Sequence, residues 1–270
     1  IWFLGMALWR IDGGDAGDDH MVRSRLCRPF LCTRMGAAGG DGLMQQLPLG
    51  VSIQDRATFA SFHPGPNSMA VERLRSLAYG DRGVIWLWGA KGSGRSHLLQ
   101  AACAAAGARR AAYLPLHELG EAATGFIADV RLLDLVCIDD IDALIGRRDF
   151  ELTLFSAYRS LDERGGGLIV AADQPPAGLN WVLADIRSRF GAAEIFQLKP
   201  LDEEGEREAL RLRATARGLD LPDDTARYLL RRFPRDMSTL GRLLDEIDLA
   251  SLSAQRRLTI PFVKSILGES

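Results

Sequence analysis

The sequence predicts an α/β protein: a five-stranded parallel sheet with helices on both faces, followed by a small domain made only of helices. Before Pro200, short apolar segments alternate with helical ones, which is the pattern of a parallel, helix-covered sheet. One of these strands runs through a glycine-rich turn into a helix, and only helical patterns follow Pro200. The five predicted strands are 84–88, 110–116, 135–138, 168–173 and 194–199.

The glycine-rich turn joins the first strand to a helix that begins near Ser96. Its glycines let backbone N–H groups point inward without Cβ clashes, and the helix aims its positive N-terminal end at the same place. This arrangement predicts a phosphate cradle. The alternative is a glycine-rich turn without a ligand, and the presence of strand, turn and helix together disfavours it. The residues expected to contact a nucleotide are Gly89, Gly92, Ser93, Gly94, Arg95, Ser96 and His97.

Arg95 stands where the G-x-x-x-x-G-K-[ST] pattern has lysine. Arginine is a planar fork on a longer stem, so its charge is expected to meet the β- and γ-phosphates differently. We expect nucleotide binding to survive this exchange, and fast self-catalysed hydrolysis to be impaired. Ser96 keeps the hydroxyl that would bind Mg²⁺.

Asp139 and Asp140 end the third predicted strand, whose continuous apolar run 135–138 is typical of a strand buried on both faces. Two carboxylates at such a strand end suit Mg²⁺ coordination and water positioning beside a phosphate. We assign Asp139 to the metal and Asp140 to catalysis. The alternative is a helix N-cap after the strand, and it remains more open for Asp140.

Two further segments complete the α/β part. The helical spacing of 150–164 is followed by the strand 168–173, which ends in a polar residue, Asp173. A helix is predicted over 180–190, and it carries Arg187 and Arg189.

Pro200 marks a boundary between the α/β part, residues 58–200, and a helical part, residues 201–270. Asp202 is a suitable N-cap for the first helix after it. Gly218, Pro222, Pro234 and Pro261 separate the helices. The predicted helices are 203–217, 223–233, 236–252 and 261–267.

Residues 1–43 lack the period of a helix or a strand, and the chain begins with Ile1. We expect them to be a disordered extension, from a start assigned too far upstream. Residues 44–57 are expected to be a binding peptide and linker. Its leucines flank Pro48 and could dock into apolar pockets of a partner, although for the hexamer 45–50 taken alone an ordinary flexible lead-in is the better explanation.

Composition limits the function classes. The chain has 270 residues and a net charge of −2, which gives no broad basic field for nonspecific nucleic-acid binding. Cys27 and Cys32 have no second Cys/His pair nearby, which argues against zinc. The four cysteines suit a reducing cytoplasm, and no apolar run is long enough to span a membrane.

Together these motifs resemble the AAA+ module of the DnaA initiator type, from about residue 58 to residue 267. The resemblance rests on the glycine-rich loop, the Asp139-Asp140 strand end, Ala172-Asp173-Gln-Pro-Pro176, Ser188-Arg189-Phe190 and the helical C-terminal part as a lid. Within that family, the chain is most similar to the regulatory inactivators of DnaA. Three features carry this: Arg95 in the loop, the peptide 46–49, and an end near residue 267 with no helix-turn-helix DNA-binding domain after it.

The resemblance implies roles for individual residues. Asp173 occupies the sensor 1 position, and Arg189 corresponds to an arginine finger that acts in trans on a neighbouring subunit's nucleotide. Gln46, Leu47 and Leu49 correspond to a motif that binds the DNA polymerase sliding clamp. Ser238 stands where the family has its sensor 2 arginine, which weakens contact with a γ-phosphate and favours ADP or ATP, with Mg²⁺, as a structural ligand.

The implied function is negative regulation of replication initiation, with DnaA and the sliding clamp as partners and no direct sequence-specific DNA binding. A homo-oligomer is left open. Two competing interpretations remain: an autonomous initiator- or loader-like ATPase, which the presence of Asp140 supports, and a nucleotide-gated adaptor without a role in hydrolysis.

Overall fold

A computed structural model describes residues 57–234, 236–254 and 258–266. The predicted extension 1–43 and residues 44–56 of the predicted peptide and linker 44–57, with Gln46, Leu47 and Leu49, lie outside the described residues.

The predicted five-stranded parallel sheet is confirmed, and its strand order is β2-β3-β4-β1-β5. All four strand pairs are parallel. Parallel pairing places the carboxyl end of every strand at one edge of the sheet, so the glycine-rich loop after β1 and the acidic residues after β3 and β4 meet there. The strands are β1 (Gly83–Gly89), β2 (Ala111–Pro115), β3 (Leu135–Asp139), β4 (Gly167–Ala172) and β5 (Glu194–Leu198).

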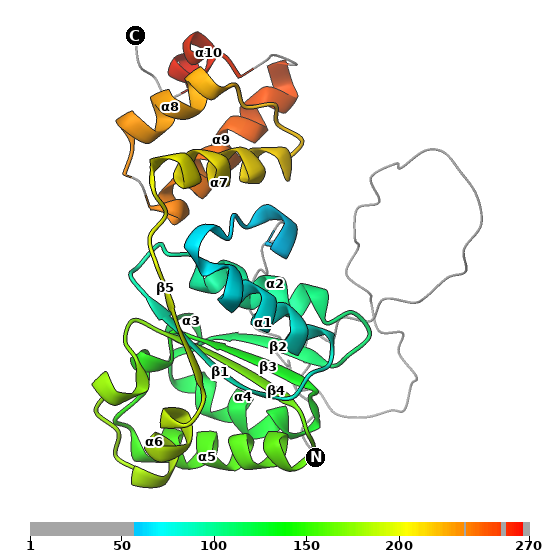
Figure 1. Cartoon of the computed structure of the whole chain (residues 1–270), viewed down its shortest axis with the longest axis vertical. Helices are drawn as coiled ribbons and strands as arrows, with labels where there is room; N and C mark the ends of the chain where they lie inside the picture. Colours follow the sequence, from blue (N-terminus) through cyan, green and yellow to red (C-terminus); the bar gives the residue numbers. More distant parts are fainter. Residues whose placement is uncertain (1–56, 235, 255–257, 267–270) are drawn as a thin grey trace, which may run out of the picture.

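Helices cover both faces of the sheet, as predicted (Figure 1). Successive residues of β1 face opposite sides, because side chains alternate along a strand. Ile85 and Leu87 join the core formed with α1 and α2, whereas Trp86 joins the core formed with α4, α5 and α6. The helices are α1 (Ser68–Tyr79), α2 (Arg95–Ala105), α3 (Leu116–Leu119), α4 (Ala123–Asp129), α5 (Arg148–Glu163) and α6 (Ala184–Gly191).

The helix predicted over 180–190 starts only at Ala184, and this boundary was predicted wrongly. The backbone N–H groups of Val182 and Leu183 donate to the carboxylate of Glu151 on α5. Helical spacing alone does not reveal this long-range contact.

The helical C-terminal region has its own apolar cluster, which includes Leu210, Leu229 and Leu244. The predicted N-cap is confirmed, because Asp202 Oδ1 accepts from Gly205 N at 2.8 Å. The other helix boundaries differ from the predicted ones by one or two residues. The helices are α7 (Glu203–Thr215), α8 (Asp223–Arg232), α9 (Met237–Ala254) and α10 (Ile260–Ile266).

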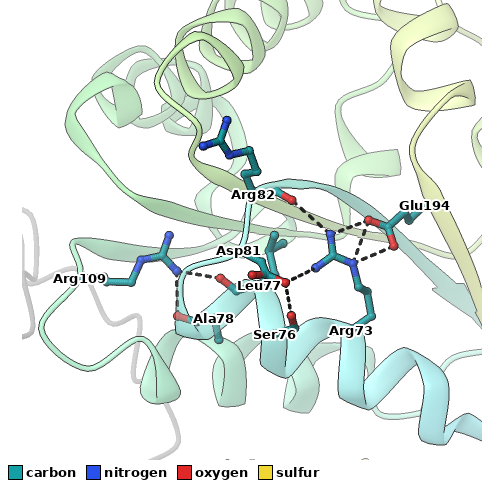
Figure 2. A network of polar contacts seen from close by, with 8 residues as sticks. All are labelled: Arg73, Ser76, Leu77, Ala78, Asp81, Arg82, Arg109 and Glu194. Atoms are coloured by element: carbon teal, nitrogen blue, oxygen red, sulfur yellow. Dashed lines mark hydrogen bonds and ion pairs between the residues drawn. The ribbon is translucent and has the colours of Figure 1, made fainter.

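A polar network at the amino end of the sheet fastens α1 to the edge strand β5 (Figure 2). Arg73 donates from Nε and Nη2 to Glu194, at 2.8 and 2.7 Å, and from Nη2 to the Arg82 carbonyl at 3.1 Å. Arg109 donates to the carbonyls of Leu77 and Ala78 at the end of α1. These contacts hold α1 against the sheet at the end opposite the glycine-rich loop. They therefore stabilise the sheet that carries this loop.

At the carboxyl edge, a side-chain clamp marks the end of β5. Asn67 Nδ2 donates to the Lys199 carbonyl at 3.0 Å, and Lys199 N donates to Asn67 Oδ1 at 2.8 Å. The clamp fixes the residue before Pro200, where the chain leaves the sheet for α7. Among the described residues, no helix combines the length and apolar character that crossing a bilayer requires.

Candidate nucleotide-binding site

The loop between β1 and α2 has the backbone of a phosphate cradle. Gly92 and Gly94 have φ angles of 81° and 98°, which favour glycine. A Cβ at Gly94 would lie 2.7 Å from Phe62 Cε2, and one at Gly92 would lie 2.9 Å from Asp236 Cβ. Gly94 caps α2 without a side-chain hydrogen bond. The first-turn N–H groups of α2 thus lack a side-chain cap and suit an anionic ligand.

Ser93 gives a second indication that this loop accepts a polar ligand. Its hydroxyl oxygen is buried and has no hydrogen-bond partner among the described residues. Because buried polar groups are nearly always paired, this orphan fits a loop that completes its bonding with phosphate.

Arg95 is directed toward the strand ends by three contacts. It is 8% exposed, and its Nη1 donates to the Gly89 carbonyl at 2.9 Å. Its Nη2 lies 2.5 Å from Asp173 Oδ1 and 3.9 Å from Asp140 Oδ1. The structure therefore brings the loop, the β3 end and the β4 end together through one guanidinium group.

Asp140 has an unusual backbone. Its φ of 52° is the only positive value at a non-glycine among the described residues, and αL geometry at such a residue stores strain. Burial, followed by the charge of Asp139, raises the pKa of Asp140, while Arg95 opposes the shift. Such a perturbed carboxyl group is typical of functional sites.

Asp139 is 1% exposed, and both of its oxygens are bonded. Oδ2 accepts from the Tyr113 hydroxyl at 2.7 Å, and Oδ1 accepts from Asp140 N at 3.1 Å. Burial and the neighbouring Asp139 charge raise the pKa of Tyr113, so the phenol stays protonated and keeps donating. Sequence reasoning missed Tyr113, because only the pairing of β2 with β3 brings it to Asp139.

These residues suit a metal ion only in part. The Ser96 residue is exposed, which leaves its hydroxyl free to bind Mg²⁺, whereas Asp139 already has both oxygens engaged. The described residues contain no group of three or more His, Cys, Asp or Glu side chains that could hold a metal ion. This donor set fits an ion that arrives with nucleotide phosphates, as Mg²⁺ commonly does.

His97 connects the α/β part to the lid. Its Nε2 lies 2.9 Å from the Thr58 carbonyl oxygen, and its Nδ1 lies 3.5 Å from Arg213 Nη2 on α7. A neutral ring protonated on Nε2 satisfies both contacts, donating to Thr58 and accepting from Arg213. Burial, then the charge of Arg213, lowers the pKa of His97 from 6.5 to about 4. The side chain of His97 thus lies between α2 and α7, beside the glycine-rich loop.

Arg213 continues the contact between α2 and the lid, because it also bonds a second lid helix. Its Nη1 donates to the Met237 carbonyl at 2.7 Å, which ties α7 to the first turn of α9. Burial lowers the pKa of Arg213 to about 10, so the side chain remains charged near neutral pH. Sequence reasoning did not select this residue, because its role depends on the packing of the lid against α2.

Arg189 lies apart from this site. It is exposed on α6, which packs on the opposite face of the sheet from α2 (Figure 1). Its guanidinium lies over the rings of Phe155 and Tyr158 on α5, 5.4 Å from each centroid. In the described part of the chain, no carboxylate pairs with it.

The fold and this site define a class of protein. The family profile of the bacterial DnaA ATPase domain matches residues 53–196, which is more than half of the chain. The chain is therefore a DnaA-related AAA+ protein, and its ATPase domain implies nucleotide binding. A second profile, of the Hda lid domain, matches residues 202–267. The two together show that the chain belongs to the Hda family.

Solved structures share the fold. Domain III of the Thermotoga maritima replication initiation protein DnaA is 20% identical, with a TM-score of 0.67 over 79% of this chain and 96% of that one. AMPPCP-bound DnaA from Aquifex aeolicus is 22% identical, with a TM-score of 0.62 over 74% and 68%. The Thermotoga maritima RuvB Holliday junction branch migration motor is 19% identical, with a TM-score of 0.53 over 74% and 66%.

The lowered pKa of His97 predicts a pH-dependent stability. The unfolded chain binds this proton near pH 6.5 and the folded chain only near pH 4, so stability present above pH 6.5 is lost as the pH falls between the two values. Relative to His97→Gln, wild type should lose about 3 kcal/mol of unfolding free energy across that window. Urea unfolding at a series of pH values measures this difference. A constant difference between the two proteins would contradict the assignment.

Arg95 should be required for nucleotide binding. In Arg95→Ala, Asp140 and Asp173 lose their shared cation and would face the phosphates as unpaired charges. Loss of a charged hydrogen-bonding group predicts an affinity for ADP at least about tenfold weaker, measured by titration with a fluorescent ADP. Arg95→Lys keeps the charge and should lose less. Unchanged affinity in Arg95→Ala would show that Arg95 does not contribute to binding.

Proposed function

We propose that this chain is a negative regulator of replication initiation that acts on the ATP held by DnaA. It holds ADP or ATP, with Mg²⁺, between its α/β part and its lid, and it docks on the sliding clamp through Gln46, Leu47 and Leu49. Arg189 then completes the active site of ATP-bound DnaA in trans, and hydrolysis leaves the initiator in its ADP form. The observation that carries the proposal is the placement of Arg189.

Three properties suit Arg189 to that role. The side chain is exposed, it stands on the face opposite its own nucleotide loop, and no described carboxylate neutralises it. The rings of Phe155 and Tyr158 support the guanidinium by cation–π contacts without blocking its donors. An arginine supplied in trans can raise the rate of phosphoryl transfer by about 10³–10⁵.

The chain's own site favours retention of nucleotide over hydrolysis. Arg95 pairs with Asp173 and lies near Asp140, so its charge is shared with the carboxylates expected to serve catalysis. Asp139, the carboxylate expected to bind the metal, is engaged as well, because it accepts a hydrogen bond from the Tyr113 hydroxyl. Bound nucleotide would then stabilise the folded protein and fix the lid by mass action. The presence of the Asp140 carboxylate beside the loop supports the rival interpretation, an autonomous ATPase.

Docking on a DNA-loaded clamp would place the regulator where replication has just passed. Tethering raises the effective concentration of a binding partner without any new contact. A chain acting with DnaA and the clamp would work in the cytoplasm, without reading DNA sequence itself.

Arg189→Ala should abolish stimulation of DnaA-bound ATP hydrolysis. The expected loss is about 10³-fold in the stimulated rate, because the developing charge loses its cation. The assay follows labelled ATP on DnaA with clamp loaded on DNA. Arg187→Ala is the matched control, since Arg187 is exposed on the same helix and should retain stimulation. Equal stimulation by wild type and Arg189→Ala would remove the finger from the mechanism.

Replacing Gln46, Leu47 and Leu49 with alanine should abolish binding to the clamp while leaving ADP affinity unchanged. The extended peptide would dock its leucines in apolar pockets, and truncation removes that contact area. A clamp pull-down and an ADP titration on the same preparation test this. Retained clamp binding would refute the role of the peptide.

A further inference from the structure

Glu151 is a fully buried carboxylate on α5. Its Oε1 accepts from Gly146 N at 2.9 Å and from Val182 N at 3.1 Å. Its Oε2 accepts from Val182 N at 3.0 Å and from Leu183 N at 2.7 Å. A buried charge is costly unless it is compensated, and here three backbone N–H groups provide the compensation.

These donors come from two segments. One follows Asp140 at the nucleotide site, and the other precedes the helix that carries Arg189. Gly146 belongs to the loop that leaves Asp140 through the short helix Ile141–Ala143. Val182 and Leu183 lead directly into α6, whose sixth residue is Arg189. Leu183 is the N-cap of α6 and supplies no side-chain cap of its own. The carboxylate of Glu151 therefore fixes where α6 begins.

The helix that carries Glu151, α5, also contacts the side chain of Arg189 near the end of α6. Phe155 and Tyr158 follow Glu151 at helical spacing and carry the Arg189 guanidinium on their rings. Tyr158 further packs edge-on against Phe190, with ring centroids 5.7 Å apart. Thus α5 sets both the start of α6 and the position of the guanidinium near its end.

We propose that Glu151 is the positioning residue for Arg189. The effect on catalysis rests on the proposed function, whereas the anchoring of α6 does not. The carboxylate orients α6 so that the guanidinium reaches the partner's nucleotide at the correct angle, and it anchors α6 to the loop that leaves Asp140. Small errors in position at a reacting centre cost large factors in rate, so loss of this anchor reduces catalysis more than binding.

The test uses Glu151→Gln in the full chain, with Asp149→Asn as the matched control. The glutamine keeps the shape but turns an NH₂ group toward backbone donors, whereas Asp149 is an exposed carboxylate on the same turn of α5. Maximal stimulation of DnaA-bound ATP hydrolysis should fall at least about tenfold in Glu151→Gln. The concentration for half-maximal stimulation should change less than about twofold, as should ADP affinity.

Amide hydrogen exchange tests the anchor without DnaA. In wild type the amides of Val182 and Leu183, although outside the helix, should be protected, and in Glu151→Gln they should exchange at least about tenfold faster while the amides of α2 stay unchanged. Unprotected amides in wild type would overturn the inference even if the variant fails to fold. So would full maximal stimulation by Glu151→Gln. If wild type fails to stimulate DnaA but the exchange pattern holds, the proposed function fails and the anchor stands.

Discussion

The ion pair between Arg95 and Asp173 is the contact on which the nucleotide site depends. It draws together the loop after β1 and the end of β4, and Asp140 at the end of β3 lies within 3.9 Å of the same guanidinium. This is possible because parallel pairing brings the three strand ends to one edge. A lysine could neutralise one carboxylate as a point charge, whereas the fork of arginine reaches the Gly89 carbonyl and Asp173 at once.

The sheet separates two tasks. Its α2 face and carboxyl edge hold the phosphate loop, and its other face carries α5 and α6 with Arg189. A cation that was part of its own site could not serve a partner. In the proposed function, this layered architecture would let one chain retain its own nucleotide while Arg189 serves the nucleotide of a partner. Beside Arg189, the rings of Trp86, Trp181 and Phe190 pack together in an aromatic cluster.

The sequence was sufficient for the features that depend on local pattern. Apolar runs, glycines and prolines predicted the five strands, the loop and the helical region after Pro200, and the aspartates at the strand ends follow from those strands. Features created by pairing across the fold were not predictable from one sequence. Tyr113 reaches Asp139 only through the β2–β3 register, and Arg213 meets His97 only when the lid packs on α2.

Glu151 shows the same limit most clearly. In the sequence it is one charged residue on a helix face, for which solvent exposure is the ordinary expectation. Its burial depends on three N–H groups, two of them more than thirty residues away. The late start of α6 has the same cause, because the carboxylate of Glu151 accepts from the N–H groups of Val182 and Leu183 before the helix begins.

In the proposed function, the chemistry takes place on the partner's nucleotide and not on this chain's own. A single-turnover experiment with two labels tests it directly: one labelled ATP is bound to DnaA, a differently labelled ATP is bound to this chain, and the two are mixed on clamp-loaded DNA. We expect rapid conversion of the DnaA label while the label on this chain persists. Rapid conversion of the label on this chain would contradict it.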